Sequence, residues 1–118
     1  MSRKIDSTTL LDTPSGTQQS GTLSDSIYNY KTVRIYYKTG DGDNGSTEVI
    51  VPTSGTVYIS VMASRPSAGL DTLYGNSAMV SLNGTTFNFS RNMSWWFSGS
   101  AQGVGAGSIS ILRIVGYK

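Results

Sequence analysis

The sequence predicts an all-β protein, an antiparallel β-sandwich of jelly-roll type with about eight strands. Apolar and polar residues alternate over several short stretches, most clearly over residues 32–38, as in strands with one buried face. Fourteen glycines, together with asparagine and serine, separate these stretches at fairly even spacing. No stretch has the period of 3.6 residues that would indicate an amphipathic helix.

The length and the charge of the chain restrict its class. With 118 residues the chain corresponds to a single domain, which we place at residues 10–118, after a flexible arm at residues 1–9. Only 14% of the residues are charged, and the net charge of +2 is spread along the chain. Nucleic-acid binding would require a basic stripe, so we do not expect it.

The residue types that are missing exclude several kinds of chemistry. The sequence contains no cysteine and no histidine, which rules out disulfides, thiolate metal sites and histidine-based catalysis. Residues 1–13 lack the apolar core of a signal peptide, and no stretch is long enough to span a membrane. We therefore expect a protein that is made in a cytoplasm, is not exported by a signal peptide and does not insert into a membrane.

The first apolar anchors of the core stand near the N-terminus. Leu10 and Leu11 predict a short edge strand, and a loop with a Pro-Ser-Gly turn follows at residues 13–21. Leu23 and Ile27 lie four residues apart among polar residues, and we expect both to tuck under the sheet.

Residues 31–63 predict three strands in a meander. In the first strand Val33 and Ile35 share one face, whereas Arg34 and Tyr36 point the other way, because side chains alternate across a strand. A glycine-rich loop and two further strands, the last with Val57 and Ile59 inward, are expected at residues 39–46, 47–51 and 55–63.

The next segment predicts a long loop and then a hairpin. Residues 64–75 form the longest break in the alternating pattern, which is typical of a functional loop or of one that covers an edge. Residues 77–90 form two alternating runs around Asn83-Gly84. An Asn-Gly pair in this position predicts a type I′ hairpin turn, which needs positive φ at both central residues.

Two further strands complete the predicted sandwich. At residues 93–97 Trp95 shares a face with Met93, so we assign it to the core and expect Trp96 to point outward. An outward tryptophan could pack against the protein or another subunit, or could form a platform for a sugar ring. The last strand, at residues 108–117, is apolar on both faces, as in a central strand or one that another subunit covers.

The acidic residues define no catalytic pair. Seven carboxylates are scattered along the chain, whereas a glycosidase needs two of them across a sugar. The run Asp41-Gly-Asp43-Asn44-Gly45 resembles the start of a calcium loop, but Glu48 stands far short of the twelfth position of an EF-hand. We therefore expect a solvated turn there, no metal site, no cofactor and no enzymatic activity.

Two stretches resemble proteins of tailed bacteriophages. Residues 21–37 read GTLSDSIYNYKTVRIYY, and the chain closes with ILRIVGYK. Both phrases are similar to distal, C-terminal domains of tail fibres and of related receptor-binding or tail-tip proteins. The resemblance implies a compact β-sandwich, usually a homotrimer, that serves virion attachment or decoration and carries no catalytic motif.

The leading hypothesis is a phage virion surface protein, in the first place a tail-fibre tip that attaches to a host-surface glycan or protein by multivalent, non-catalytic binding. The last strand would pack one face in its own core and the other between subunits, through Ile109 and Ile111 with Leu112 and Ile114 opposite. Ligand contacts are expected from loops at one end of the sandwich. The candidate ligand-binding residues are Asp41, Asp43, Asn44, Arg65, Tyr74 and Trp96.

Two alternatives stay open at this point. The same trimer could decorate the capsid or the tail by binding other virion proteins, with residues 1–9 as the docking segment. The second alternative is a free-standing carbohydrate-binding module, monomeric and not viral.

Overall fold

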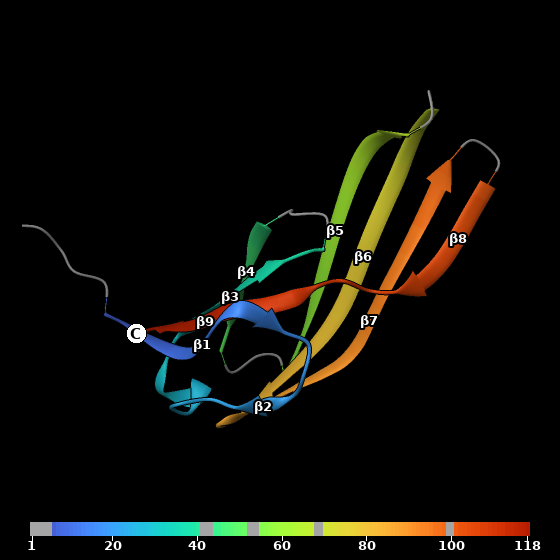
Figure 1. Cartoon of the computed structure of the whole chain (residues 1–118). Coiled ribbons are helices and arrows are strands. Elements are labelled where there is room, and N and C mark those ends of the chain that lie inside the picture. Colours follow the sequence, from blue (N-terminus) through green and yellow to red (C-terminus); the bar gives the residue numbers. More distant parts are fainter. Residues whose placement is uncertain (1–5, 41–43, 52–54, 68–69, 99–100) are drawn as a thin grey trace, which may run out of the picture.

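Two antiparallel sheets account for most of the chain in the computed structural model, which describes residues 6–40, 44–51, 55–67, 70–98 and 101–118 (Figure 1). The predicted β-sandwich is confirmed, with nine strands where about eight were expected. The strands are β1 (Ser7–Thr17), β2 (Gly21–Thr22), β3 (Thr32–Lys38), β4 (Asn44–Ile50), β5 (Thr56–Ser67), β6 (Leu70–Asn83), β7 (Thr86–Ser98), β8 (Ala101–Ala106) and β9 (Ser110–Tyr117). A single turn of 3-10 helix, η1, spans Ile27–Asn29.

The strands divide into a small and a large sheet. The small sheet has the order β1-β9-β3-β4. In the large sheet β5, β6 and β7 follow one another, and both β2 and β8 pair with β7 at different heights. The predicted meander over residues 31–63 is therefore wrong, because β4 ends in the small sheet and β5 begins the large one. Alternation along a strand identifies its buried face but not the sheet to which it belongs.

The core lies between the two sheets and is built from aliphatic side chains. The inward positions predicted for Val33, Ile35, Val57 and Ile59 are confirmed, since all four are buried. The other main members are Leu10, Leu23, Ile27, Tyr30, Ala78, Val80, Leu82, Phe87, Ile109, Ile111 and Ile114. Burial of these side chains provides the main favourable contribution to folding.

The segment between β2 and β3 closes one end of the sandwich. Leu23 and Ile27 are buried there, as predicted, and their amides donate to the carbonyls of Thr85 and Gly84 at 2.7 and 3.0 Å. Asp25 accepts hydrogen bonds from the Tyr30 hydroxyl, the Ser26 amide and the Asn29 side chain at 2.8, 2.8 and 2.9 Å. These bonds, above all the one from Tyr30, lower the pKa of the Asp25 carboxyl and fix the turn.

The hairpin between β6 and β7 is confirmed, but its turn lies one residue further along. Asn83 pairs with Thr86, so the two turn residues are Gly84 and Thr85. Gly84 has φ +58°, the left-handed conformation that the first central position of a hairpin turn requires and that glycine adopts without strain. The hydroxyl of Thr86 donates to the Asn83 carbonyl at 2.8 Å and closes the turn.

The break predicted at residues 64–75 is wrong. β5 and β6 form one long hairpin, and their pairing runs without a register shift from Thr56 opposite Ser81 to Ser67 opposite Leu70. Pro66 interrupts the strand pattern in the sequence, yet it stands in β5, which is the edge strand of the large sheet. An edge strand tolerates proline because one of its sides needs no ladder hydrogen bonds.

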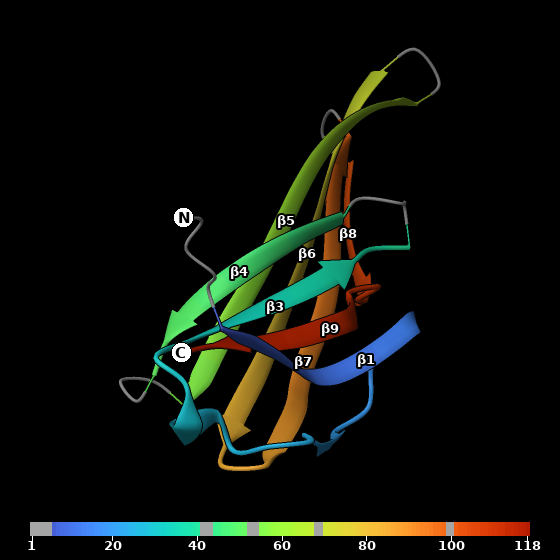
Figure 2. The same ribbon diagram turned by 90° about the vertical axis from the view of Figure 1, so that its left-hand side faces the viewer.

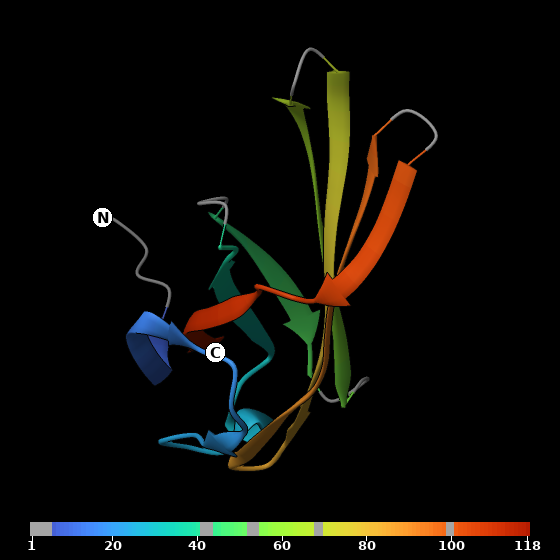
Figure 3. The ribbon, with the colours of Figure 1, turned by 45° about the vertical axis from the view of Figure 1, so that its right-hand side comes forward.

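The large sheet extends well beyond the small one. The far ends of β5, β6, β7 and β8 project past the small sheet in Figure 1, and Figure 2 and Figure 3 show the same overhang from two other sides. The radius of gyration is 16.2 Å, against about 13.5 Å for a compact domain of this length. We call this overhang the wing, and it comprises residues 61–67, 70–76, 92–98 and 101–106.

The small sheet begins inside the segment that we assigned to a flexible arm. Ser7, Thr8 and Thr9 pair with the end of β9, and the Lys118 amide donates to the Asp6 carbonyl at 3.0 Å. Residues 1–5 lie outside the described part of the chain. Within the described part, no helix has the length and the apolar character that crossing a membrane would require.

Candidate functional site

The structure describes the backbone at four of the six predicted ligand-binding residues. Asp41 and Asp43 lie outside the described residues, and Asn44 is the first residue of β4 rather than part of a loop. Arg65 and Tyr74 belong to the β5–β6 hairpin, not to a loop. Tyr74 is the cross-strand partner of Trp96 on β7, so the structure brings these two together. Their role in binding stays a prediction.

The two tryptophans of β7 lie on the faces opposite to those expected. Ser90 is an extra residue in β7, since Met79 pairs with Arg91 and Val80 with Phe89. This bulge reverses the alternation, so Trp95 lies on the outer face of the large sheet and Trp96 on the face that continues the core. The assignment of Trp95 to the core is therefore wrong, although Trp96 is 38% exposed because it stands beyond the small sheet.

The outer face of the wing carries a group of apolar side chains, all of them exposed except Trp95, which is half-buried. Leu73 lies opposite Phe97, and Val104 lies opposite Trp95, on adjacent strands of the large sheet. The Trp95 and Phe97 rings are in contact, with centroids 5.6 Å apart. Among the side chains that the structure describes on this face, the single charge is Arg91, at the edge nearest the β6–β7 turn. We call this surface the apolar wing face; it comprises Met62, Leu73, Met93, Trp95, Phe97 and Val104.

The residues expected between subunits are mostly buried inside their own chain. Ile109, Ile111 and Ile114 have no exposed surface, so they cannot contact a neighbour. Leu112 forms a β-bulge in β9. Tyr36 pairs with Arg113 and Tyr37 with Ile111, so Leu112 has no partner in β3. The bulge puts Ile111 and Ile114 on the same, inner face, which corrects the prediction that they lie opposite one another. Leu112 alone is half-buried and available at the surface.

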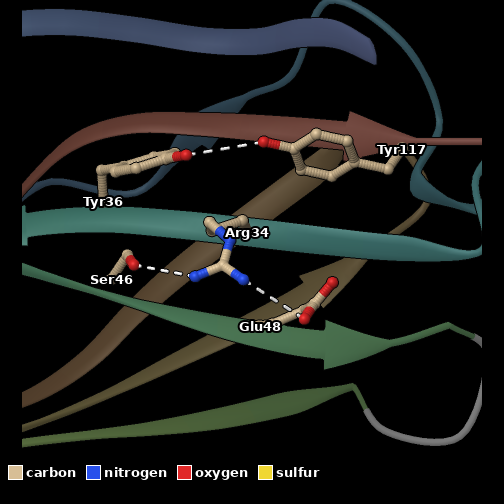
Figure 4. Close-up of polar contacts among 5 residues, drawn as sticks. All are labelled: Arg34, Tyr36, Ser46, Glu48 and Tyr117. Atoms are coloured by element: carbon tan, nitrogen blue, oxygen red, sulfur yellow. Dashed lines mark hydrogen bonds and ion pairs between the residues drawn. The ribbon is translucent and has the colours of Figure 1, made fainter. Parts of the chain in front are cut away.

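The outer face of the small sheet carries two tyrosines and two arginines side by side. Arg34 and Tyr36 come from β3, and Arg113 and Tyr117 come from the neighbouring strand β9. The hydroxyls of Tyr36 and Tyr117 lie 3.5 Å apart, and the Arg113 guanidinium lies 4.5 Å from the centre of the Tyr36 ring. Figure 4 shows the two phenols pointing toward one another along the sheet. We call Arg34, Tyr36, Arg113 and Tyr117 the tyrosine–arginine face.

The charges on this face are partly balanced from β4. Arg34 donates to the Ser46 hydroxyl at 2.9 Å and forms an ion pair with Glu48 at 3.3 Å (Figure 4). Both side chains of the ion pair stay accessible to solvent, so water screens it and it contributes little to stability. Arg34 is therefore available to a ligand that competes with Glu48.

The hydrogen bond between the tyrosines makes them chemically unequal. Tyr117 and, to a smaller extent, the guanidinium groups of Arg113 and Arg34 lower the pKa of Tyr36 below its ordinary value. The same hydrogen bond, with some burial, raises the pKa of Tyr117. Either hydroxyl can donate the hydrogen bond between them.

Two hollows flank the tyrosine pair. The larger, of about 530 Å³, is lined by Lys31, Thr32, Arg34, Glu48, Tyr117 and Lys118. The smaller, of about 260 Å³, is lined by Asp12, Pro14, Tyr36, Leu112 and Arg113. Each tyrosine forms part of one hollow, so the hydrogen-bonded pair stands between them. Such an arrangement can hold an elongated polar ligand across the sheet.

The sequence did not identify this face as a site, although it indicated the outward direction of two of the four side chains. The alternation over residues 32–38 placed Arg34 and Tyr36 on the outward face, as the structure has them. The pairing of β3 with β9, some 80 residues later, brings Arg113 and Tyr117 beside them. No local pattern indicates such a long-range pairing.

The described part of the chain contains no cluster of metal-ligating side chains. No group of three or more acidic residues there could hold a metal ion. The sequence matches no protein-family model and no curated protein. The two surfaces of the described residues that could bind a partner or a ligand are the apolar wing face and the tyrosine–arginine face.

Proposed function

We propose that this chain is a non-catalytic attachment domain on the surface of a tailed-phage virion, at a tail-fibre tip, and that it works as a homotrimer. The fold and the resemblance of residues 21–37 and of the last strand support a virion protein. Neighbouring tail or capsid proteins would hold the trimer in place. Ligands would be bound by several copies at once, which turns weak single sites into firm attachment.

The observation that carries this proposal is the apolar wing face. Trp95, Phe97 and Val104 stand together on a sheet that no second layer covers on that side, and Val104 is 73% exposed. A contiguous apolar patch of this kind is a common mark of a protein interface. A domain that acts as a free monomer has no use for such a face, so the observation favours a multi-chain assembly over a free-standing carbohydrate-binding module.

We infer that copies of the same chain cover this face. The six side chains of the apolar wing face carry no charge, so two copies can meet there without like-charge repulsion, whereas a partner of strong charge would gain nothing from them. β8, at the rim of the wing, reads AQGVGA and lacks the charges and prolines that normally protect an edge strand from pairing. Both features suit contact between subunits.

The solution mass tests the assembly. We expect three chains for the wild-type protein by light scattering after size exclusion, and one chain for Val104→Asp, because a carboxylate would be buried at the contact. Ile50→Asp is the matched control, since Ile50 is 66% exposed on the small sheet, away from the wing. A single-chain mass for the wild type at high concentration, or loss of the trimer in both variants, would contradict the assignment of the interface.

Labelling of virions tests the location. Antibodies raised against the purified chain should decorate the tail tip of intact phage particles in electron micrographs. Labelling of the head instead would identify a capsid decoration protein, and absence of any label would overturn the virion assignment.

A further inference from the structure

We propose that the tyrosine–arginine face binds an acidic glycan, a sugar chain that carries carboxylate groups, across the two hollows of the small sheet. The inference rests on the attachment role proposed above, for which it names the chemical class of the ligand. It uses a surface that points away from the apolar wing face and stays open when copies of the chain associate there.

The shape of the surface suits a chain of sugars. The two hollows lie on the same face of one sheet, and the hydrogen-bonded phenols of Tyr36 and Tyr117 separate them. The combined volume of the two hollows is larger than a single small ion would fill. A sugar unit in each hollow would leave the linkage between the units above the tyrosine pair.

The charges on this face indicate an anionic ligand. The hollows contain the four cations Lys31, Arg34, Arg113 and Lys118 against the two acids Asp12 and Glu48. Among the described residues the single ion pair is that of Arg34 with Glu48. Arg113 forms none, even though Asp12 stands opposite it in the β1–β9 register. Arg113 and Lys31 are therefore available to carboxylate groups of a ligand.

Arg113 is positioned in advance for this task. Its guanidinium lies over the Tyr36 ring, 4.5 Å from the ring centre, and this cation–π contact holds the group in place on the surface of the sheet. A guanidinium held in this way presents two parallel donors to a carboxylate, a stronger and more directional contact than a lysine gives. Little side-chain entropy is then lost when a ligand binds.

The neighbouring groups favour a sugar over other anions. Hydroxyls of Tyr36, Tyr117 and Ser46 stand between the cations and can exchange hydrogen bonds with sugar hydroxyls. A nucleic acid would need a continuous basic stripe, which four cations around two separate hollows do not provide. The alternation of charge, hydroxyl and aromatic ring fits a polyhydroxylated ligand with occasional carboxylates.

The experiment titrates the full chain with two trisaccharides and measures binding by NMR and by calorimetry. Trigalacturonate is the acidic probe, and maltotriose is the neutral trisaccharide of the same length. Trigalacturonate should bind and shift resonances of the small sheet, whereas maltotriose should bind at least about tenfold more weakly. Arg113→Gln should weaken trigalacturonate binding about tenfold, because one charge-assisted contact is lost. The matched control is Arg91→Gln, an exposed arginine on the large sheet, which should leave the affinity unchanged.

Glu48→Gln is the second variant, and it should act in the opposite direction. It removes the acid that competes for Arg34, so trigalacturonate should bind about threefold more tightly. A gain of this kind does not arise from damage to the fold.

Three results would overturn the inference. They are equal affinity for the neutral and the acidic trisaccharide, equal losses in the Arg113→Gln and Arg91→Gln variants, and no binding of trigalacturonate at millimolar concentration. If free galacturonate bound as tightly as the trisaccharide, the site would recognise only a carboxylate group. This result would overturn the proposal that the ligand occupies both hollows. A monomeric protein that binds trigalacturonate as expected would keep this inference and reject the trimeric attachment role.

Discussion

Single glycines decide where the two tryptophans of the wing can lie. The Trp95 ring rests directly on Gly75 of the neighbouring strand, and the Trp96 ring rests in the same way on Gly103, so neither glycine has space for a Cβ atom. The absence of a side chain lets each ring lie flat on the sheet. A large aromatic surface is thereby kept close to the backbone on a wing that has only one layer of strands.

We predict that Gly75→Ala displaces Trp95 and destabilises the protein by about 1–3 kcal/mol, because the added methyl group overlaps the indole ring. Urea unfolding followed by tryptophan fluorescence measures both effects. Gly105→Ala on β8 is the control, since a Cβ there would meet only the Ser94 hydroxyl at an ordinary distance of 3.6 Å. Equal stability of the two variants would show that Trp95 does not depend on Gly75.

At the scale of the strand, the crossover from β8 to β9 is held by a buried asparagine. Asn76 on β6 is only 6% exposed, and its side-chain oxygen accepts hydrogen bonds from the amide and the hydroxyl of Ser108 at 3.0 and 3.2 Å. Through this contact the large sheet fixes the point at which the chain leaves for the small sheet. Buried polar groups of this kind are costly to leave unpaired.

We expect Asn76→Ala to lower the free energy of unfolding by about 1–3 kcal/mol, because the Ser108 amide would lose its acceptor in a partly buried position. Asn88→Ala is the matched control, an exposed asparagine whose side chain bonds Ser20, and it should cost at most about 0.5 kcal/mol. Urea titrations of both variants give the comparison. A similar cost for the two would mean that the crossover is held by other contacts.

The buried face of a strand could be predicted from the sequence only where apolar and polar residues alternate regularly. β3 and the first half of β5 follow a strict two-residue period, and their buried residues Val33, Ile35 and Ile59 were placed correctly. The bulges at Ser90 and Leu112 could not be foreseen, because one inserted residue reverses every face beyond it without changing the residue types. For this reason Ile111 and Ile114 were assigned to opposite faces. Trp95 was assigned to the core for another reason, because it shares a face with the apolar residue Met93.

At the scale of the whole molecule, the two sheets present outer faces of opposite chemistry. The small sheet carries Arg34, Tyr36, Arg113 and Tyr117, whereas the apolar wing face of the large sheet consists of six uncharged apolar side chains. The sequence could indicate outward residues on single strands. It could not indicate the two surfaces, since each is assembled from strands that pair across long stretches of chain. Separation of the faces lets one serve assembly while the other stays open to ligand.

This separation leads to a prediction about avidity. Val104→Asp should leave the affinity of each site for soluble trigalacturonate unchanged, because Val104 lies on the wing, away from the hollows of the small sheet. On a surface coated with polygalacturonate, however, the monomeric variant should be retained about 100-fold less well than the trimer, since it can engage only one site at a time. Calorimetry measures the first quantity and biosensor dissociation the second.

Calorimetry and biosensor dissociation together distinguish a loss of avidity from damage to the binding site, which neither measurement does alone. If Val104→Asp lowered both affinities by the same factor, the substitution would have disturbed the small sheet, and the two faces would not be independent. If it lowered neither, the copies in the trimer would not reach the coated surface together, and their hollows would have to point in divergent directions. Only a loss confined to the coated surface agrees with an assembly in which the wing joins the chains and the tyrosine–arginine faces bind in concert.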